Sequence, residues 1–351
     1  MSTVTMFDVA RCAGVSTGTV SNSLNHPDKV RQETREQVQR AIHELGFVPN
    51  HNARMLAGGV NPAFGLILTG LDHAMALQLA QGAQDAAHRH GFELLIASVD
   101  NNDVLENRYL DYFLGAQMAG LLLEPRADSK WRLGTEGKIP SVALDVRGDP
   151  EHGCSVAADN RHEGRLAAEH ALSLGRVRIA VIASLDPIRS LIERLEGIRE
   201  VLDAAGVLLD EVHIARTWRD RASATEIGIS IGRSDTRQRP DFIIALTDVL
   251  AAGIMDGLLT EGVRVPEDIA VMGCDGNQMA WDGPIPMTTV LPHGYEMGES
   301  GVELLTAELF APESHQHELA LIEPALVVKE STVGRSILRD PRGTHAQGAD
   351  R

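Results

Sequence analysis

The chain has 351 residues, of which 43% are hydrophobic and 23% charged, a composition typical of a globular protein with more than one domain. Its formal net charge of −17 argues against a protein that binds nucleic acid over its whole surface. We expect no transmembrane helix, because no apolar run reaches about 18 residues. The N-terminus, MSTVTMFDVARCAG, lacks the basic and apolar regions of a secretory signal.

The three cysteines, Cys12, Cys154 and Cys274, are far apart in the sequence. They show neither the spacing of metal ligands nor that of a disulfide framework. Together with the missing signal, this favours a cytoplasmic protein with no metal and no cofactor.

The charge is unevenly distributed along the chain. Residues 1–60 carry six basic and five acidic side chains, so this segment is close to +1 and the remainder close to −18. DNA repels an acidic body. Any contact with DNA must therefore be concentrated near the N-terminus.

The first predicted elements form a helix-turn-helix. Thr5 and Asp8 have the spacing of a capping box, which predicts a helix that runs to about Ala13. Gly14 supplies the backbone freedom of a tight turn, and Ser16 can cap a second helix. The second helix of such a pair enters the major groove of DNA. The apolar residues that can close over one small core are Val9, Ala10, Ala13, Val15, Val20 and Leu24.

A third helix is predicted from Gln32 to Leu45, where apolar residues recur at spacings of three and four, and Gly46 ends it. The GVSTG segment, residues 14–18, also fits the G-x-S-x-G nucleophile elbow of hydrolases. That motif requires a strand before it, whereas here a helix is predicted, so the hydrolase interpretation is disfavoured.

The segment TMFDVARCAGVSTGTVSNSLNHPDKVRQETREQVQRAIHELGFVPNHNARMLAGG resembles the DNA-binding headpiece of the lactose-repressor family. The match is dense and ordered over more than fifty residues. The resemblance implies a transcription regulator, most often a repressor, that binds a palindromic operator as a homodimer and responds to a small-molecule effector. The matching positions are Asp8-Val9-Ala10, Ala13-Gly14-Val15-Ser16, Thr19-Val20-Ser21, Leu24-Asn25, Glu33-Thr34-Arg35, Pro49-Asn50, Ala53-Arg54 and Leu56.

The docking geometry of the motif places Thr17, Gly18 and Asn22 at base edges. The family most often carries arginine where this chain has Asn22. Arginine suits guanine, whereas asparagine suits adenine, so the operator preference is expected to differ at that position. Arg31 replaces the serine usual in the family, which removes a helix cap and adds a phosphate partner. The remaining contacts expected in the headpiece are Thr5, Ser16, Thr19, Ser21, Asn25 and Thr34.

Residues 50–58 are a candidate short helix capped by Asn50. Nine residues are fewer than the roughly 12–15 at which an isolated helix becomes stable in water. The resemblance implies that this is a hinge helix, which pairs with its twin in the minor groove through Asn50, Ala53, Arg54 and Leu56. Leu56 would be the wedge between base steps. The alternative is a plain interdomain linker.

After Pro62 the pattern changes to apolar runs of strand length that alternate with helix-length segments. Such runs indicate parallel sheets covered on both faces. About 270 residues of this pattern suit two doubly wound lobes that bind a ligand between the carboxyl ends of their strands. The predicted strands are 63–69, 92–98, 119–124, 140–145, 177–183, 241–246 and 268–273.

Residues 158–182, 193–207, 245–276 and 286–305 resemble the family's sensor domain, which is similar to periplasmic sugar-binding proteins. The resemblance implies that the chain crosses between the lobes near Asp159, Val290 and Glu323. The expected fold is a small all-α helix-turn-helix headpiece plus a two-lobed α/β sensor of doubly wound parallel sheets. The expected domains are the headpiece at 1–48, the hinge and linker at 49–61, the sensor and dimerisation domain at 62–334 and a disordered tail at 335–351.

The resemblance implies that Arg194, in Arg-Leu-x-Gly, and Asp275, in Gly-Cys-Asp-Gly, bind the effector. The alternative for each is a salt bridge that stabilises a lobe. Thr247, Asp145 and Trp218 are further candidates for the effector cleft, although Trp218 could also be core or interface. Asp248 is interpreted as the cap of the helix that follows it.

The segment LDHAMALQLA, residues 71–80, lacks the aromatic residues that the family carries there, so the effector can be a sugar or another small polar metabolite. The sequence also leaves open whether the effector weakens or promotes DNA binding, and whether the assembly is a dimer or a tetramer. A solute-binding transport protein is disfavoured by the missing signal and the extra sixty residues. An enzyme is disfavoured because we find no activated nucleophile, metal cluster or phosphate loop in the sequence.

Overall fold

The computed structural model describes residues 4–25, 29–47, 61–71, 74–100, 102–126, 139–185, 188–209, 213–277 and 279–338. The chain divides into two compact units, 1–61 and 62–351, and each is described by itself. The hinge residues Asn50, Ala53, Arg54 and Leu56 lie outside the described residues, so their predicted roles stay predictions.

The N-terminal unit contains the three predicted helices, α1 (Met6–Ala13), α2 (Thr17–Asn25) and α3 (Gln32–Leu45). The capping box at the start of α1 is present: the Asp8 amide donates to Thr5 Oγ1 over 3.4 Å, and the Thr5 amide donates to Asp8 Oδ2 over 3.0 Å. Gly14 ends α1 with a φ of 68°. The Thr19 amide donates to Ser16 Oγ over 3.1 Å, so Ser16 caps α2 as expected. Arg31 precedes α3 without a side-chain capping bond, which confirms the lost cap.

One small core holds these helices together. Val9, Val20 and Val38 are fully buried, one from each helix. The other residues of the predicted core pack against them, and Phe47, which follows α3, closes the core from outside the predicted set. A rigid three-helix scaffold therefore presents the surface of α2.

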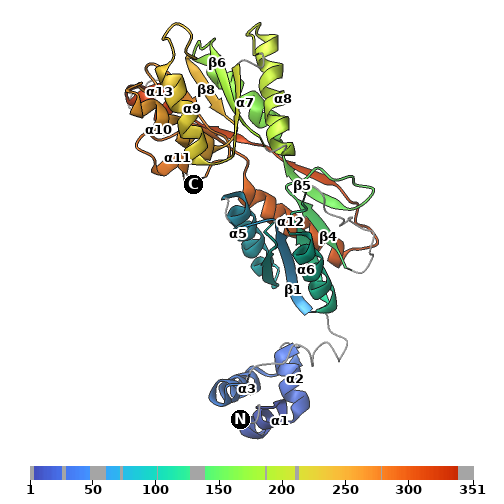
Figure 1. The fold of residues 1–351 in the computed structure, drawn as a ribbon. Helices are drawn as coiled ribbons and strands as arrows, with labels where there is room; N and C mark the ends of the chain where they lie inside the picture. The colour runs from blue at the N-terminus through green and yellow to red at the C-terminus, as the bar shows by residue number, and fades with distance from the viewer. Residues whose placement is uncertain are drawn as a thin grey trace. The chain divides into compact units, whose positions relative to one another are not determined.

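The first lobe of the second unit is built on a six-stranded sheet in the order β11-β5-β4-β3-β1-β2 (Figure 1). Its strands are β1 (Asn61–Leu68), β2 (Glu93–Ser98), β3 (Met118–Leu123), β4 (Ser141–Leu144), β5 (Cys154–Ala158) and β11 (Leu319–Ile322). The pairs β1–β2, β3–β4, β4–β5 and β5–β11 run parallel. Apolar side chains on one face pack with α5 (Ala74–Arg89) and α12 (Gly294–Phe310). Those on the other face pack with α6 (Asp103–Gly115).

The second lobe is built on a four-stranded parallel sheet in the order β7-β6-β8-β9. Its strands are β6 (Ile179–Ser184), β7 (Ile214–Thr217), β8 (Phe242–Ala245) and β9 (Ala270–Met272). Both faces bear buried apolar clusters. The helices of this lobe are α7 (Asn160–Ser173), α8 (Arg189–Ala204), α9 (Arg221–Arg233), α10 (Asp248–Thr260), α11 (Met279–Asp282) and α13 (Glu330–Leu338).

The chain passes between the lobes at the three predicted places. Strand β5 belongs to the first sheet, and α7 follows it in the second lobe. Strands β10 (Thr289–Leu291) and β12 (Ala325–Val327) pair antiparallel beside the second lobe, whereas α12 and β11 between them belong to the first. The predicted two-lobed parallel fold is therefore confirmed.

Two details differ from the sequence predictions. Helix α13 continues to Leu338, so the prediction of disorder is wrong for residues 335–338; residues 339–351 lie outside the described part of the chain. Strands β5, β7, β10, β11 and β12, each of three to five residues, were not predicted. Among the described residues no helix is long and apolar enough to cross a membrane.

Candidate functional site

The exposed surface of α2 holds the residues predicted to read bases. Thr17, Gly18 and Asn22 are exposed, and Ser16 is exposed at the start of the helix. Thr19 is half-buried, and its Oγ1 lies 2.9 Å from Ser16 Oγ. Core residue Val20 faces away from this surface, so α2 has one face for the core and one for a partner.

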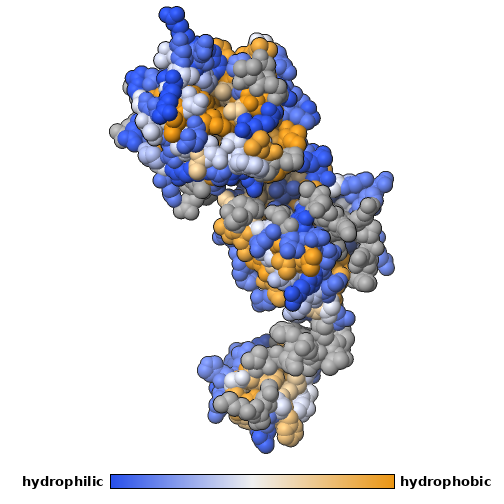
Figure 2. Space-filling model, in the orientation of Figure 1, coloured by the Kyte–Doolittle hydropathy of each residue, from blue (hydrophilic) through white to orange (hydrophobic). Residues whose placement is uncertain are grey.

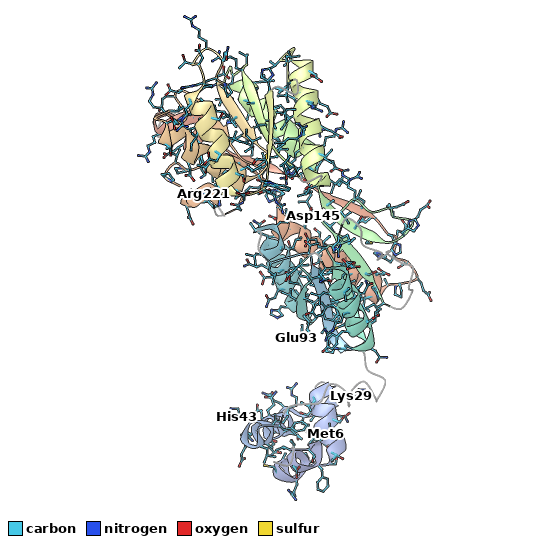
Figure 3. All side chains as sticks on the ribbon, in the orientation of Figure 1. Met6, Lys29, His43, Glu93, Asp145 and Arg221 are labelled. Atoms are coloured by element: carbon cyan, nitrogen blue, oxygen red, sulfur yellow. The ribbon has the colours of Figure 1, made fainter. Side chains whose placement is uncertain are left out.

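The remaining predicted contacts of the headpiece surround this surface in sequence. Thr5 and Arg31 are exposed, whereas Ser21 and Thr34 are half-buried. The side chain of Asn25, at the end of α2, lies outside the described residues. Figure 3 labels Met6, Lys29 and His43 on this unit; Lys29 and His43 are exposed, whereas Met6 packs against the small core.

In the second unit the structure brings Arg194 and Asp275 together. Arg194 lies on α8 and Asp275 follows β9, yet Nη1 of Arg194 donates to Asp275 Oδ1 over 3.0 Å. The same nitrogen donates to the carbonyl of Leu246 over 2.9 Å. The Arg194 side chain is only 5% exposed, whereas Asp275 is 29% exposed. Asp275 can therefore still be reached from outside.

Glu163 completes this arrangement and was missed by the sequence analysis. Its Oε2 lies 2.7 Å from Arg194 Nε, and its side chain is fully buried. Glu163 lies on α7 one turn before the buried Ala167. A glutamate on the apolar face of a helix was the signal that could have found it.

Asp248 is a fourth member of the site. Its Oδ1 accepts from Thr289 Oγ1 over 2.6 Å, and its Oδ2 accepts from the Asn277 amide over 2.8 Å. The prediction that Asp248 caps α10 is wrong, since Thr247 is the cap and accepts from the Leu250 amide. Thr247 is buried, and its hydroxyl is used in that cap.

Asp145 lies where β4 ends, on the first lobe, and is labelled in Figure 3. It adopts a φ of 54°, and Asp275 a φ of 146°, both in the left-handed region that few residues other than glycine occupy. Such conformations persist where the surrounding structure holds them, and they cluster at functional sites. Trp218 is 60% exposed, so it is not a core residue, which was one of the alternatives for it.

These residues form what we call the acidic cluster: the carboxyl groups of Asp145, Glu163, Asp248 and Asp275 around the Arg194 guanidinium. Burial raises the pKa of Glu163 to about 8, against the opposing effect of Arg194. Burial, together with the charge of Glu124, raises the pKa of Asp145 to about 7. Burial, together with the charge of Asp275, raises the pKa of Asp248 to about 7. One guanidinium does not neutralise four carboxyl groups, so the cluster holds protons near neutral pH.

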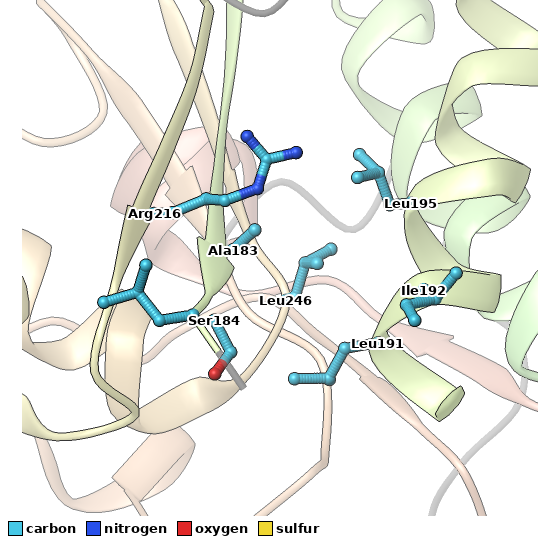
Figure 4. A pocket seen from close by; sticks show the side chains of 8 residues that line it. Ala183, Ser184, Leu191, Ile192, Leu195, Arg216 and Leu246 are labelled. Atoms are coloured by element: carbon cyan, nitrogen blue, oxygen red, sulfur yellow. The ribbon is translucent and has the colours of Figure 1, made fainter. Parts of the chain in front are cut away.

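A pocket of about 220 Å³ adjoins the cluster at the carboxyl ends of β6 and β8. Leu246 belongs to both, because its side chain lines the pocket and its carbonyl accepts from Arg194. In Figure 4 the α8 residues lie across the pocket from Arg216, and the lining is Ala183, Ser184, Leu185, Leu191, Ile192, Leu195, Arg216 and Leu246. The site thus combines a buried polar group with an apolar recess, as small-molecule sites commonly do.

Comparisons with known proteins match both parts of the chain. Residues 5–50 match the family described as "Bacterial regulatory proteins, lacI family", and residues 168–332 match a "Periplasmic binding protein-like domain". The chain is 32% identical to the HTH-type transcriptional regulator CelR of Thermobifida fusca over 92% of its own length and 96% of the relative's. It is 28% identical to the HTH-type transcriptional regulator DegA of Bacillus subtilis over 93% and 98% of the two chains.

Solved structures show the same fold. A transcriptional regulator CelR–cellobiose complex is 28% identical, covers 93% of this chain and 99% of its own, and has a TM-score of 0.65. The Lac repressor dimer bound to operator and the anti-inducer ONPF is 23% identical, with a TM-score of 0.76 over 94% and 99% of the two chains. At that identity the likeness concerns the fold.

Proposed function

The chain belongs to the LacI family of bacterial regulatory proteins, and from this we propose that it represses transcription in the cytoplasm by binding a palindromic operator as a dimer under the control of a small-molecule effector. It is a transcriptional regulator and not an enzyme. The observation that supports operator binding most directly is the exposed surface of α2, with Thr17, Gly18 and Asn22, on a scaffold whose opposite face is buried. A helix presented in this way fits the major groove.

Operator binding is expected to weaken steeply with salt although the protein is acidic. Contact is confined to a headpiece near +1, and each neutralised phosphate releases counterions. Fluorescence anisotropy with genomic fragments selected by gel shift measures the affinity over a range of salt. Several phosphate contacts give a log–log slope of several units. A slope near zero would exclude this mode of DNA binding.

Asn22→Arg is expected to change base preference at one symmetric position of the operator from adenine towards guanine, by roughly 1–3 kcal/mol. Asn22 is exposed on α2, where its amide can reach a base edge. Selection of binding sites from a random library measures the preference. Gln37→Arg on the exposed part of α3 adds the same charge and should leave the preference unchanged. If both variants select the wild-type site, Asn22 does not read sequence.

Exposed apolar side chains on the first lobe support the proposed dimer. Strand β2 is the edge of its sheet, and Leu95 and Ile96 on it are 39% and 43% exposed. Leu77 on α5 is 56% exposed. An exposed apolar edge strand can pair with another chain, so we propose that a second copy of this chain covers it. Figure 2 shows that apolar patches interrupt the hydrophilic surface of this unit.

The acidic cluster supports a neutral effector that carries hydroxyl groups. Four carboxyl groups around one guanidinium repel an anion, whereas they can accept hydrogen bonds from hydroxyls. The apolar pocket beside them suits the hydrophobic face of a sugar ring or a substituent on it. We therefore propose a saccharide, in keeping with the cellobiose complex of the structural relative.

Effector affinity is expected to rise as the pH rises through about 7, the value to which burial raises the pKa of Asp145. A hydroxyl that donates to a carboxylate favours its charged form, so binding lowers that pKa and releases a proton. Isothermal titration with cellobiose and a panel of neutral sugars over this pH range measures the effect. Asp145→Asn should flatten the part of the pH dependence that Asp145 contributes. A falling affinity over the same range would contradict the proposed contact.

The way in which the effector controls DNA binding follows from the two lobes. Asp145 belongs to the first lobe, and Arg194 and Asp275 belong to the second. Arg147 of the first lobe already lies 3.9 Å from Glu193 of α8, so charged groups of the two lobes meet here. We propose that an effector held between them changes the relative position of the lobes, and that the segment 49–61 transmits the change.

A further inference from the structure

A second group of polar side chains lies in the first lobe, outside the acidic cluster. The last turn of α12 carries Glu308, and the loop from α12 to β11 carries His315 and His317. Each of the three residues offers one ligand atom, and these atoms all lie within 4.8 Å of one another. Nothing in the DNA-binding or effector function requires them.

The spacing of these atoms is close to that of ligands on one metal ion. His317 Nε2 lies 3.8 Å from Glu308 Oε1. Tetrahedral bonds of about 2.0–2.2 Å separate neighbouring ligand atoms by roughly 3.3–3.6 Å. A change of a few tenths of an ångström therefore brings the pair to bonding distance of a shared ion. Glu308 and His315 are half-buried, which leaves room for small side-chain movements.

Cys154 places a sulfur atom beside this group. It is fully buried at the start of β5, and its Sγ lies 3.1 Å from His315 Nε2. The contact joins residues that are 161 positions apart in the chain. A thiol in this position can orient the imidazole of His315 as a neighbour of a ligand. This contact strengthens a site for an ion that prefers imidazole ligands.

The local charge favours a cation. Glu313 and Glu318 flank the two histidines, and residues 265–328 contain neither lysine nor arginine. Imidazole, carboxylate and thiol together suit zinc and similar transition-metal ions, whereas magnesium and calcium prefer oxygen ligands. The composition of the group therefore points to one class of ion.

We propose that Glu308, His315 and His317, with Cys154 beside them, bind one divalent transition-metal ion of the zinc class. The ion joins the end of α12 and the following loop to the start of β5. Both segments lie in the first lobe. Each is followed by a place where the chain passes into the second lobe: β5 leads to α7, and β11 leads to β12. The bound metal stabilises this lobe, since an ion that binds only the folded chain raises its stability.

The test uses the purified full chain after treatment with a chelator, with zinc chloride as the probe. Isothermal titration should show one zinc ion per chain in the proposed site, and thermal unfolding should shift to higher temperature with zinc and not with magnesium. The double variant His315→Ala/His317→Ala should lose at least about 100-fold in zinc affinity, beyond the roughly 10–100-fold that loss of a neighbouring group costs. Cys154→Ser should lose about 10–100-fold.

The matched control is His43→Ala/His213→Ala, which removes two imidazoles from other parts of the chain and should keep the zinc affinity of the wild type. Glu308→Gln is a milder second variant for the case in which the double variant fails to fold, judged by circular dichroism. Glu308→Gln should also weaken zinc binding. The proposal is overturned if the wild-type chain takes up no zinc, or if the folded site variants bind it as tightly as the control.

Discussion

Arg194→Met is expected to destabilise the chain by about 1–3 kcal/mol near neutral pH and to abolish the effector response, because the buried acceptors around Arg194 are left without their hydrogen-bond donor. The Arg194 side chain is 5% exposed and its partner Glu163 is fully buried. The carbonyl of Leu246 and one oxygen of Asp275 also lose their donor. Urea unfolding measures the loss of stability, and titration with the effector measures the response.

The loss should depend on pH, which separates this explanation from a simple loss of packing. Beside Arg194 the pKa of Glu163 is already about 8, because burial raises it. Without the guanidinium it must lie higher still. The folded variant then holds a proton that the unfolded chain releases, so its stability falls as the pH rises from the ordinary value of 4.5 to this raised pKa. The stability of the wild type stops falling near pH 8, so the difference between variant and wild type should widen above pH 8.

Arg189→Met is the matched control for this experiment. Arg189 lies on the same helix and pairs with Glu193, but its side chain is 80% exposed. Exposed ion pairs contribute little to stability, so this variant should unfold like the wild type. If Arg194→Met also unfolds like the wild type at every pH and still responds to effector, then the acidic cluster is neither a structural nor a binding centre.

Gly197→Ala is expected to destabilise the second lobe by roughly 1–3 kcal/mol or more through overpacking. A Cβ at Gly197 would lie 2.0 Å from the carbonyl oxygen of Arg161 on α7. The contact is reciprocal, because a Cβ at Gly164 would lie 2.0 Å from the carbonyl oxygen of Arg194. The two helices touch through their backbones, so the added methyl group must push them apart.

The same displacement should impair the site. Glu163 precedes Gly164 on α7, and Arg194 lies one turn before Gly197 on α8. Separation of the helices therefore lengthens the Arg194–Glu163 contact of 2.7 Å. Thermal unfolding and effector titration of the full chain measure both effects. Weakened effector binding would support the coupling of packing to the site.

Gly115→Ala is the control for the helical glycine itself. Gly115 ends α6, and a Cβ there meets nothing within 4 Å. This variant should be neutral or slightly more stable, since alanine is the better helix former by up to about 1 kcal/mol. Equal stability of Gly197→Ala and Gly115→Ala would show that α7 and α8 can separate without cost.

The headpiece was predictable from the sequence because its signals are local. A capping box, a glycine at a left-handed turn and a serine cap each act over no more than four residues, and each was found where expected. The two-lobed sheet was predictable from its long apolar strands, because full burial imposes a continuous pattern. Strand β7 has only two consecutive apolar residues, Ile214 and Ala215, so the sequence does not mark it as a strand.

The site was predictable only in part. The motifs around Arg194 and Asp275 predicted that both residues belong to the site. They did not predict that the two side chains pair with each other. Glu163 and Asp248 were missed or misassigned, because a carboxyl group buried by packing looks in the sequence like any charged residue of a helix. The contact between Cys154 and His315 joins the start of β5 to the loop before β11, which the β5–β11 pairing brings together.

The sequence by itself thus determined the class of protein, the three helices of the headpiece and the parallel two-lobed architecture. Their physical causes are short-range: capping, backbone freedom at glycine and the period of apolar residues. Only the tertiary structure decided which charges share a buried site and which glycines let helices touch. It also decided which histidines meet a cysteine. Those outcomes depend on pairs of residues far apart in the chain, and burial, which sets their energies, exists only once the sheets and helices have packed.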